Sequence, residues 1–135
     1  MSKIIYIYLL VYAVIVIHEM AHFLVAYNLG LAVASCELGT GPALWHRQWK
    51  GINFNVRLFP WEGKVRMAFT SRKKWKNLSF IAAGPAANIL TFLALWTPGS
   101  QASDFASISL LVGLLNLNPF WNGSDGQHIW RLIRP

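Results

Sequence analysis

The sequence predicts an α-helical membrane protein with three membrane-spanning helices and a small β-hairpin between the first and second spans. Of its 135 residues, 55% are hydrophobic and 13% are charged, so the charged share is about half of what soluble domains carry. Two apolar stretches are long enough to cross a bilayer, and the segment between them alternates between apolar and polar residues. This composition argues against a water-soluble globule. We expect one membrane-embedded domain over residues 1–135.

The first span is expected over residues 4–26, where only His18, Glu19 and His22 interrupt the apolar run. As a helix this segment would be roughly 34 Å long, enough to cross the hydrocarbon core. Lys3 followed by apolar residues also resembles the start of a signal peptide. The run is too long for that, and no small-residue cleavage site follows a short core, so a retained span is predicted.

A β-hairpin is expected in the region of residues 44–70. Apolar side chains recur at every second position, first at Ile52, Phe54, Val56 and Leu58 and then at Val65, Met67 and Phe69. This period of two is typical of strands, and the sequence Pro-Trp-Glu-Gly at 60–63 is a turn signal between the two runs. The pattern therefore predicts two strands, 52–58 and 64–69, paired with each other.

The second span is expected over residues 78–96 and the third over about 105–120. The third apolar stretch, residues 105–117, would reach only roughly 20 Å as a helix before Asn118 and Pro119 interrupt it. Such a segment reads as a span that unwinds before it leaves the membrane. Irregular backbone at that depth is tolerated where protein buries it or a wet cavity borders it, so Asp125 is predicted to face a cavity.

The positions of the charges predict the orientation. Twelve Lys and Arg stand against five Asp and Glu, and nine of the twelve lie between Arg47 and Lys76, whereas residues 97–104 contain none. Because short cytoplasmic loops collect Lys and Arg, the N-terminus is predicted outside, and the hairpin loop and C-terminus in the cytoplasm. The run at 72–76 is interpreted as an anchor at lipid headgroups, since no nucleic-acid recognition motif is present.

Residues 18–22, His-Glu-Met-Ala-His, form an HExxH motif. On a helix, His18 and His22 project from one face and can both reach a zinc ion at roughly 2.0 to 2.1 Å, while Glu19 is placed to take a proton from metal-bound water. Ionisable groups inside a span are costly unless they are paired or bind metal, so the trio is a candidate site. The alternative is that both histidines only hydrogen-bond to neighbouring helices.

Catalytic zinc usually has a third protein ligand, for which the sequence offers Asp125, His128, His46 and Cys36. Asp125 is favoured because the third span runs in the same direction as the first and unwinds at a similar depth, and His128 is its nearest competitor. His46 and Cys36 belong to the loop. Cys36 is the single cysteine, which excludes an internal disulfide.

The motifs in this order resemble those of the site-2 proteases, zinc metalloproteases that cut peptide bonds within the membrane. The resemblance rests on residues 18–22, on Gly-Pro-Ala-Ala-Asn at 84–88, and on Asn-Leu-Asn-Pro at 116–119 leading to Asp125. The segment Gly-Lys-Val-Arg-Met at 63–67 is similar to a strand of that family. Asp125 lies one residue farther from Asn116 than in most members, and Glu62 stands where a second glycine is common.

The resemblance implies a three-span site-2 protease core, a sheet that presents substrate, and one catalytic Zn²⁺. It implies His18, His22 and Asp125 as the zinc ligands and Glu19 as the general acid/base. Asn88 and Asn116 are amide donors in the other two spans; they are candidates for binding the substrate backbone or the oxyanion, or alternatively for hydrogen bonds between helices.

The expected function is therefore zinc-dependent hydrolysis of peptide bonds in or near transmembrane segments of membrane-protein substrates. Substrate would be led to the zinc by pairing with an exposed strand edge. The expected partners are such a substrate, the lipid bilayer and an unidentified regulatory membrane protein, with no nucleic acid. Two alternatives stay open: an inactive homologue that binds membrane peptides, and a metal transporter, for which three short spans without a repeat leave little room.

Overall fold

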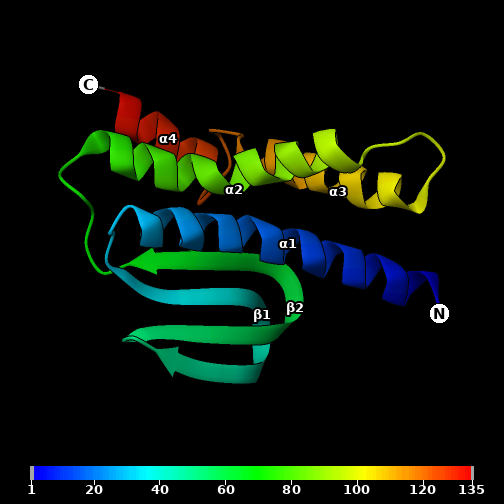
Figure 1. Cartoon of the computed structure of the whole chain (residues 1–135), viewed down its shortest axis with the longest axis horizontal. Helices are drawn as coiled ribbons and strands as arrows, with labels where there is room; N and C mark the ends of the chain where they lie inside the picture. The colour runs from blue at the N-terminus through cyan, green and yellow to red at the C-terminus, as the bar shows by residue number, and fades with distance from the viewer. Residues whose placement is uncertain (1, 135) are drawn as a thin grey trace.

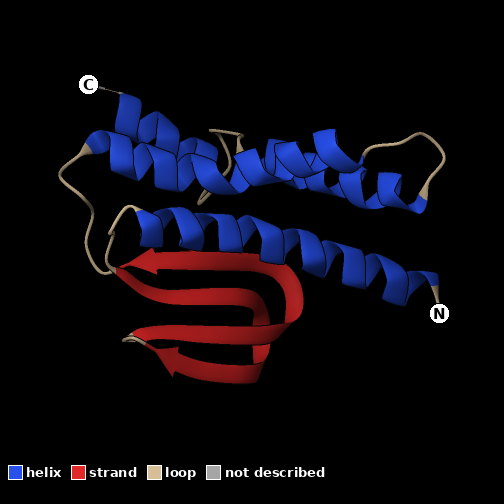
Figure 2. Ribbon diagram, viewed as in Figure 1, coloured by secondary structure: helices blue, strands red, loops and turns tan. Residues whose placement is uncertain are grey.

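The computed structural model describes residues 2–134, and Figure 1 shows the order of its elements. The long helix α1 (Lys3–Asn28) is followed by strands β1 (Val33–Trp49) and β2 (Ile52–Met67), then by helices α2 (Lys74–Leu95), α3 (Gln101–Asn116) and α4 (Asp125–Ile133). The sheet lies along one side of α1, and α2, α3 and α4 lie along the other side (Figure 2). The fold is therefore three layers with α1 in the middle.

Two of the helices, α1 and α2, are long and apolar enough to cross a membrane, with 26 and 22 residues. Helix α1 begins one residue before the predicted first span, and α2 begins four residues before the predicted second span. Helix α3 has 16 residues and begins and ends about one turn before the predicted span of 105–120. It ends at Asn116 because Pro119 cannot donate a backbone hydrogen bond and disfavours helix in the residue before it. The helix thus lies about one turn earlier than the predicted span, and the third membrane crossing itself stays a prediction.

The predicted pairing of the hairpin is wrong. Residues 52–58 and 64–67 both belong to β2, and β1 lies between them: Cys36 is opposite Val65 on one side and Phe54 on the other. Each long strand bends and pairs twice, so the segments 63–67, 33–38, 53–56 and 43–49 follow one another across the sheet. The tight turn of the hairpin is at Lys50 and Gly51, where φ is positive at 48° and 79°.

The sheet is fixed to the side of α1. Phe23 of α1 packs edge-on against Phe54 with ring centroids 5.2 Å apart, over a core that includes buried Cys36 and Ile52. Farther along α1, the Tyr12 hydroxyl lies 2.7 Å from the Arg57 carbonyl oxygen, to which it donates. The sheet therefore lies beside α1 rather than beyond its end.

Helix α3 packs on α2 through small residues. The Ser109 hydroxyl donates to the Asn88 carbonyl oxygen at 3.1 Å, and a Cβ placed on Gly113 would lie 3.1 Å from the Asn88 Cβ. Pro85 is inside α2 and fully buried. These contacts bring α3 close to α2, so that the turn after α3 returns toward the middle of α1.

Gly39 is predicted to be essential for the bend in β1. Its φ is +84°, and a Cβ there would lie 2.7 Å from the Phe59 carbonyl oxygen, whereas Gly51 has φ +79° with open space around it. Both Gly39→Ala and Gly51→Ala should lose about 1 kcal/mol for the backbone conformation, and Gly39→Ala a further 1 to 3 kcal/mol for the collision. Thermal unfolding in detergent measures the difference; equal losses would contradict the prediction.

Candidate functional site

Helix α1 carries the three residues of the HExxH motif in the middle layer of the fold. His18, Glu19 and His22 are all buried, with 4%, 6% and 4% of their surfaces exposed. Because His18 and His22 are four residues apart, their rings lie on one face of the helix, with centroids 4.8 Å apart. This face is turned toward α2 and α4.

The first residue of α4, Asp125, meets both histidines. Its Oδ2 atom lies 3.0 Å from His18 Nε2 and 3.3 Å from His22 Nε2, and the two Nε2 atoms are 3.1 Å apart. The structure thus brings together the three residues that the sequence suggested as a ligand set, although 107 positions separate His18 from Asp125.

The donor set fits a zinc ion. Ligands at about 2.0 to 2.1 Å from a tetrahedral centre are about 3.3 to 3.4 Å from one another, and the three atoms form a triangle with sides of 3.0, 3.1 and 3.3 Å. His22 Nδ1 lies 2.7 Å from the Phe80 carbonyl oxygen, which accepts its hydrogen. The lone pair of His22 is therefore on Nε2, the atom that faces Asp125.

Local backbone contacts hold Asp125 in place. The Ser124 hydroxyl accepts from the Gln127 amide at 3.1 Å as the N-cap of α4, and it donates to the Asn118 carbonyl oxygen at 2.6 Å. Gly126 packs directly on the Leu117 carbonyl, where a Cβ would collide. These contacts fix the turn after α3 so that the carboxylate reaches the histidines.

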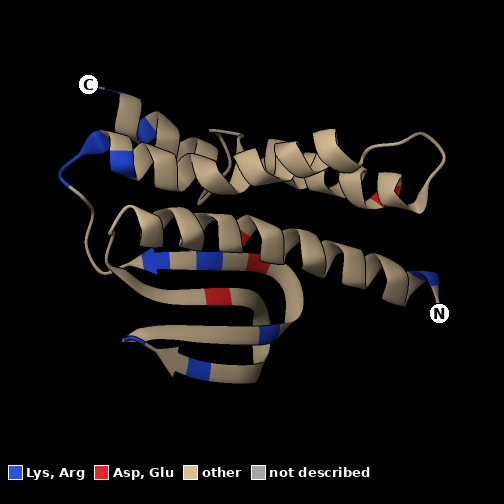
Figure 3. Ribbon diagram, in the orientation of Figure 1, with Lys and Arg blue, Asp and Glu red and all other residues tan. Residues whose placement is uncertain are grey.

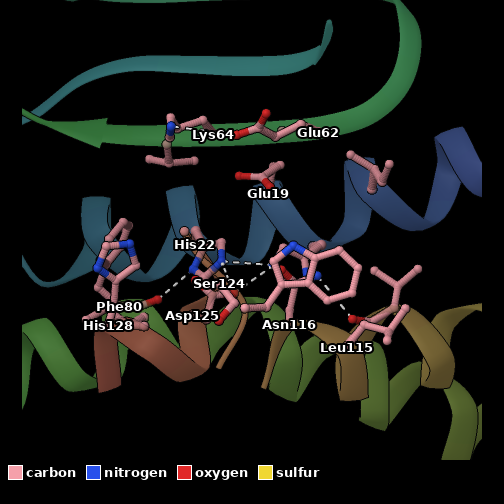
Figure 4. A pocket seen from close by; sticks show the side chains of 18 of the residues that line it. Glu19, His22, Glu62, Lys64, Phe80, Leu115, Asn116, Ser124, Asp125 and His128 are labelled. Carbon is pink, nitrogen blue, oxygen red and sulfur yellow. Dashed lines mark hydrogen bonds and ion pairs between the residues drawn. The ribbon is translucent and has the colours of Figure 1, made fainter. Parts of the chain in front are cut away.

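A cavity of about 930 Å³ opens beside this cluster, and Figure 4 shows its lining. Asp125 lines it, as the sequence predicts. Glu19 lies between α1 and β2, across from Glu62 and Lys64, whereas His22 and Asp125 lie on the other side of α1 (Figure 4). Gly63 of β2 touches the Glu19 side chain so closely that a Cβ would collide with it. One cavity is thus lined by Glu19, by the cluster of His18, His22 and Asp125, and by the edge of β2.

The other candidate ligands lie elsewhere. His128 lines the cavity but is exposed and outside the cluster, and His46 Nδ1 is 2.7 Å from Asn55 Oδ1 on the exposed part of the sheet. Cys36 is buried on β1 between the sheet and α1, and burial, with the charges of Glu19 and Glu37, raises the pKa of its thiol to about 12. A thiol with so high a pKa is a poor metal ligand at neutral pH.

The two asparagines differ in position. Asn116 lines the cavity, and its amide donates to the Val112 carbonyl oxygen at 3.1 Å. Asn88 is fully buried behind His18, with its Nδ2 atom 3.1 Å from His18 Nδ1. Within residues 2–134 its Oδ1 atom has no hydrogen-bond partner. If the Asn88 amide is rotated by 180°, its Oδ1 atom accepts the hydrogen of His18 Nδ1. The Nε2 atom of His18 then carries the lone pair and is free to bind metal.

Three residues that position the site were not assigned this role from the sequence. Gly84 of α2 touches His18 and His22, and a Cβ there would collide with both imidazoles. Ser124 precedes a helix, which is an N-cap signal that could have identified it. The Phe80 carbonyl oxygen, which accepts from His22, carries no signal in the sequence because any residue type supplies that atom.

Comparison with known proteins places the chain in a family. The model of peptidase family M50 matches residues 6–103, which include nearly all of α1, the whole sheet and all of α2. The chain belongs to peptidase family M50. This confirms the resemblance to the site-2 proteases. The M50 match includes the HExxH motif and residues 84–88, and Asp125 lies beyond its end.

Several M50 relatives resemble the chain over most of its length. A predicted zinc metalloprotease of Chlamydia pneumoniae is 31% identical, covering 73% of this chain and 20% of the relative. The regulator of sigma-E protease RseP of Escherichia coli is 34% identical over 61% of this chain and 22% of its own length. A predicted zinc metalloprotease of Xylella fastidiosa is 32% identical over 58% and 22%. The chain spans about a fifth of these relatives.

Gly84 is predicted to be required for the cluster. Gly84→Ala pushes a methyl group into both imidazoles, so metal affinity should fall by more than about tenfold. Gly51→Ala is the control, since nothing lies within 4 Å of a Cβ placed there and the substitution costs only the backbone strain described above. Competition with a chromogenic chelator measures zinc affinity. Unchanged affinity in Gly84→Ala would contradict the geometry described above.

Proposed function

We propose that this chain is an intramembrane zinc metalloprotease that cuts peptide bonds in or near transmembrane segments of membrane proteins. The observation that carries the proposal is the triangle of His18, His22 and Asp125 donor atoms, buried among apolar helices and opening on a cavity that also contains Glu19. Membership of a peptidase family, with relatives named as zinc metalloproteases, supports it.

His18, His22 and Asp125 are the proposed ligands of one Zn²⁺ ion. Zinc bound there would supply Lewis-acid activation of a water molecule and of the peptide carbonyl. The protein's part is to keep the donor atoms converged: α1 sets the spacing of the histidines, the Phe80 carbonyl orients His22, and the start of α4 presents Asp125.

Glu19 is the proposed general base and acid. Its carboxylate takes a proton from the attacking water and delivers it to the nitrogen of the leaving amine, which separates the two peptide fragments. Its place beside Gly63 supports this role, because the missing side chain at 63 leaves room for the carboxylate between α1 and the strand edge. Asn116, which lines the same cavity, is a proposed donor to the substrate backbone.

The substrate is proposed to bind as an extended strand. Segment 63–67 of β2 pairs with β1 on one side, and all its residues except Arg66 also line the cavity. A helix hides its peptide carbonyls in internal hydrogen bonds, whereas an unwound segment added to this edge would present them near Glu19. The sheet lies beside α1, so this edge is at a depth that a transmembrane substrate reaches.

We propose a multi-pass arrangement as one membrane-embedded unit, with α1 and α2 as spans and α3 completing a third crossing together with the turn that follows it. The N-terminus is placed outside, and the Lys50 turn and the end of α4 at the cytoplasmic surface, following the positions of the basic residues. The partners are then the bilayer, a membrane-protein substrate and an unidentified regulatory protein.

Glu19→Gln is predicted to abolish cleavage while zinc stays bound, because the amide cannot carry the proton and is not in the ligand triangle. The purified Glu19→Gln variant should cleave a model transmembrane substrate at least about 10²-fold more slowly than the wild-type protein. Folded, zinc-loaded wild-type protein that cleaves no such substrate would favour the inactive homologue. Zinc uptake into sealed vesicles would favour transport instead.

Asn88→Ala is predicted to weaken zinc binding by about 10- to 100-fold, because Asn88 lies behind His18 and fixes its ring. If Asn88 instead bound the oxyanion, its loss would lower the cleavage rate with zinc affinity unchanged. Zinc affinity and cleavage rate measured on the same preparation separate these two roles. Asn116→Ala serves as the comparison, since it should lower the rate and keep the metal.

A further inference from the structure

One end of the molecule is strongly basic. The turn between β1 and β2, the start of α2 and the end of α4 all lie there, and Figure 3 shows the blue of Lys and Arg on each of them. We call this the basic end; its residues are Lys50, Arg72, Lys73, Lys74, Lys76, Arg131 and Arg134. Within residues 2–134, no ion pair joins any of these side chains to a carboxylate.

Each of the three elements at the basic end also places a cation over an exposed tryptophan. Lys50 lies 4.7 Å from the ring centroid of Trp49, Lys76 lies 5.8 Å from that of Trp75, and Arg134 lies 4.5 Å from that of Trp130. Tryptophan beside Lys or Arg is the pairing found at the boundary between acyl chains and headgroups. Three such pairs at one end indicate a shared membrane surface.

Helix α4 has the pattern of a helix that lies at this boundary. Trp130 and Ile133 are 47% and 64% exposed, Arg131 is exposed beside them, and Arg134, the C-cap, lies over the Trp130 ring. The helix packs against the start of α2, where Lys73 and Lys74 are exposed. The two helices therefore bring like charges together, and these repel unless anions lie between or beside them.

We propose that the basic end binds the headgroups of anionic phospholipids, and that this contact holds α4 against α2 and thereby keeps Asp125 with the two histidines. Charge complementarity favours this ligand. The basic end presents cations next to exposed apolar side chains, and an anionic bilayer offers negative headgroups next to acyl chains. The effect on Asp125 rests on the proposed function, in which Asp125 is a zinc ligand. Zinc affinity then scales with the fraction of molecules in which α4 is docked.

Hydrogen exchange tests the lipid contact without reference to activity. The full chain in nanodiscs of phosphatidylcholine is compared with nanodiscs to which phosphatidylglycerol is added. Backbone amides of residues 125–133 should be about tenfold more protected in the anionic bilayer. Arg131→Gln/Arg134→Gln should lose that difference, and the control Lys3→Gln/Arg57→Gln, which removes two charges away from the basic end, should keep it.

Equal protection of wild-type α4 in both bilayers would overturn the proposal, as would an equal loss in the control variant. Inorganic phosphate added to phosphatidylcholine nanodiscs should leave the exchange unchanged; if it reproduces the effect of phosphatidylglycerol, the surface binds free phosphate instead of lipid.

Chelator competition in the same samples tests whether the lipid contact changes zinc affinity. Zinc should bind about tenfold more tightly in the anionic bilayer, and the Arg131→Gln/Arg134→Gln variant should lose this gain. Equal affinity in both bilayers would overturn the link. Protection of α4 that depends on lipid, with no zinc bound in either bilayer, would overturn the proposed metal site and leave the lipid contact standing.

Discussion

The fold depends on the contact between two buried imidazoles and one carboxylate inside an apolar structure. Burying such groups costs several kcal/mol each unless they are paired or bound to a metal. Here His18 and His22 face Asp125 at hydrogen-bond distances, and the Phe80 carbonyl accepts the remaining ring hydrogen of His22. The rest of the chain is arranged around this contact: α1 carries the histidines, α2 backs them, and the turn after α3 returns Asp125.

Three glycines allow the elements around the site to approach it closely. Gly84, Gly63 and Gly126 each occupy a place where a methyl group would collide with an imidazole, with Glu19 or with the Leu117 carbonyl. Because each glycine lies on a different element, α2, β2 and α4 all approach the site to within backbone contact. The polar cluster is thus closely surrounded by main chain, and the cavity described above opens beside it.

The sequence predicts the chemistry of the site better than the shape around it. HExxH spacing fixes the histidines on one helix face, and Asn-Pro after a short helix indicates that Asp125 follows an unwound turn. The sheet was mispredicted because alternation reports which residues form strands and not which strands pair; Gly39 and Gly41 suggest a turn, although β1 continues through them with positive φ. Likewise, nothing in the sequence shows that Asn88 lies behind His18, since that contact depends on how α2 crosses α1.

The separation of 107 positions between His18 and Asp125 has a consequence for biosynthesis. A ribosome adds about 5 to 20 residues per second, so roughly 5 to 20 s pass between the emergence of the histidines and that of the carboxylate. During that interval the chain holds two of its three proposed ligands and no complete metal centre. Under the proposed function, the chain would therefore have no metal-dependent activity while it is being inserted among other membrane proteins, and it would gain that activity only when α4 has docked.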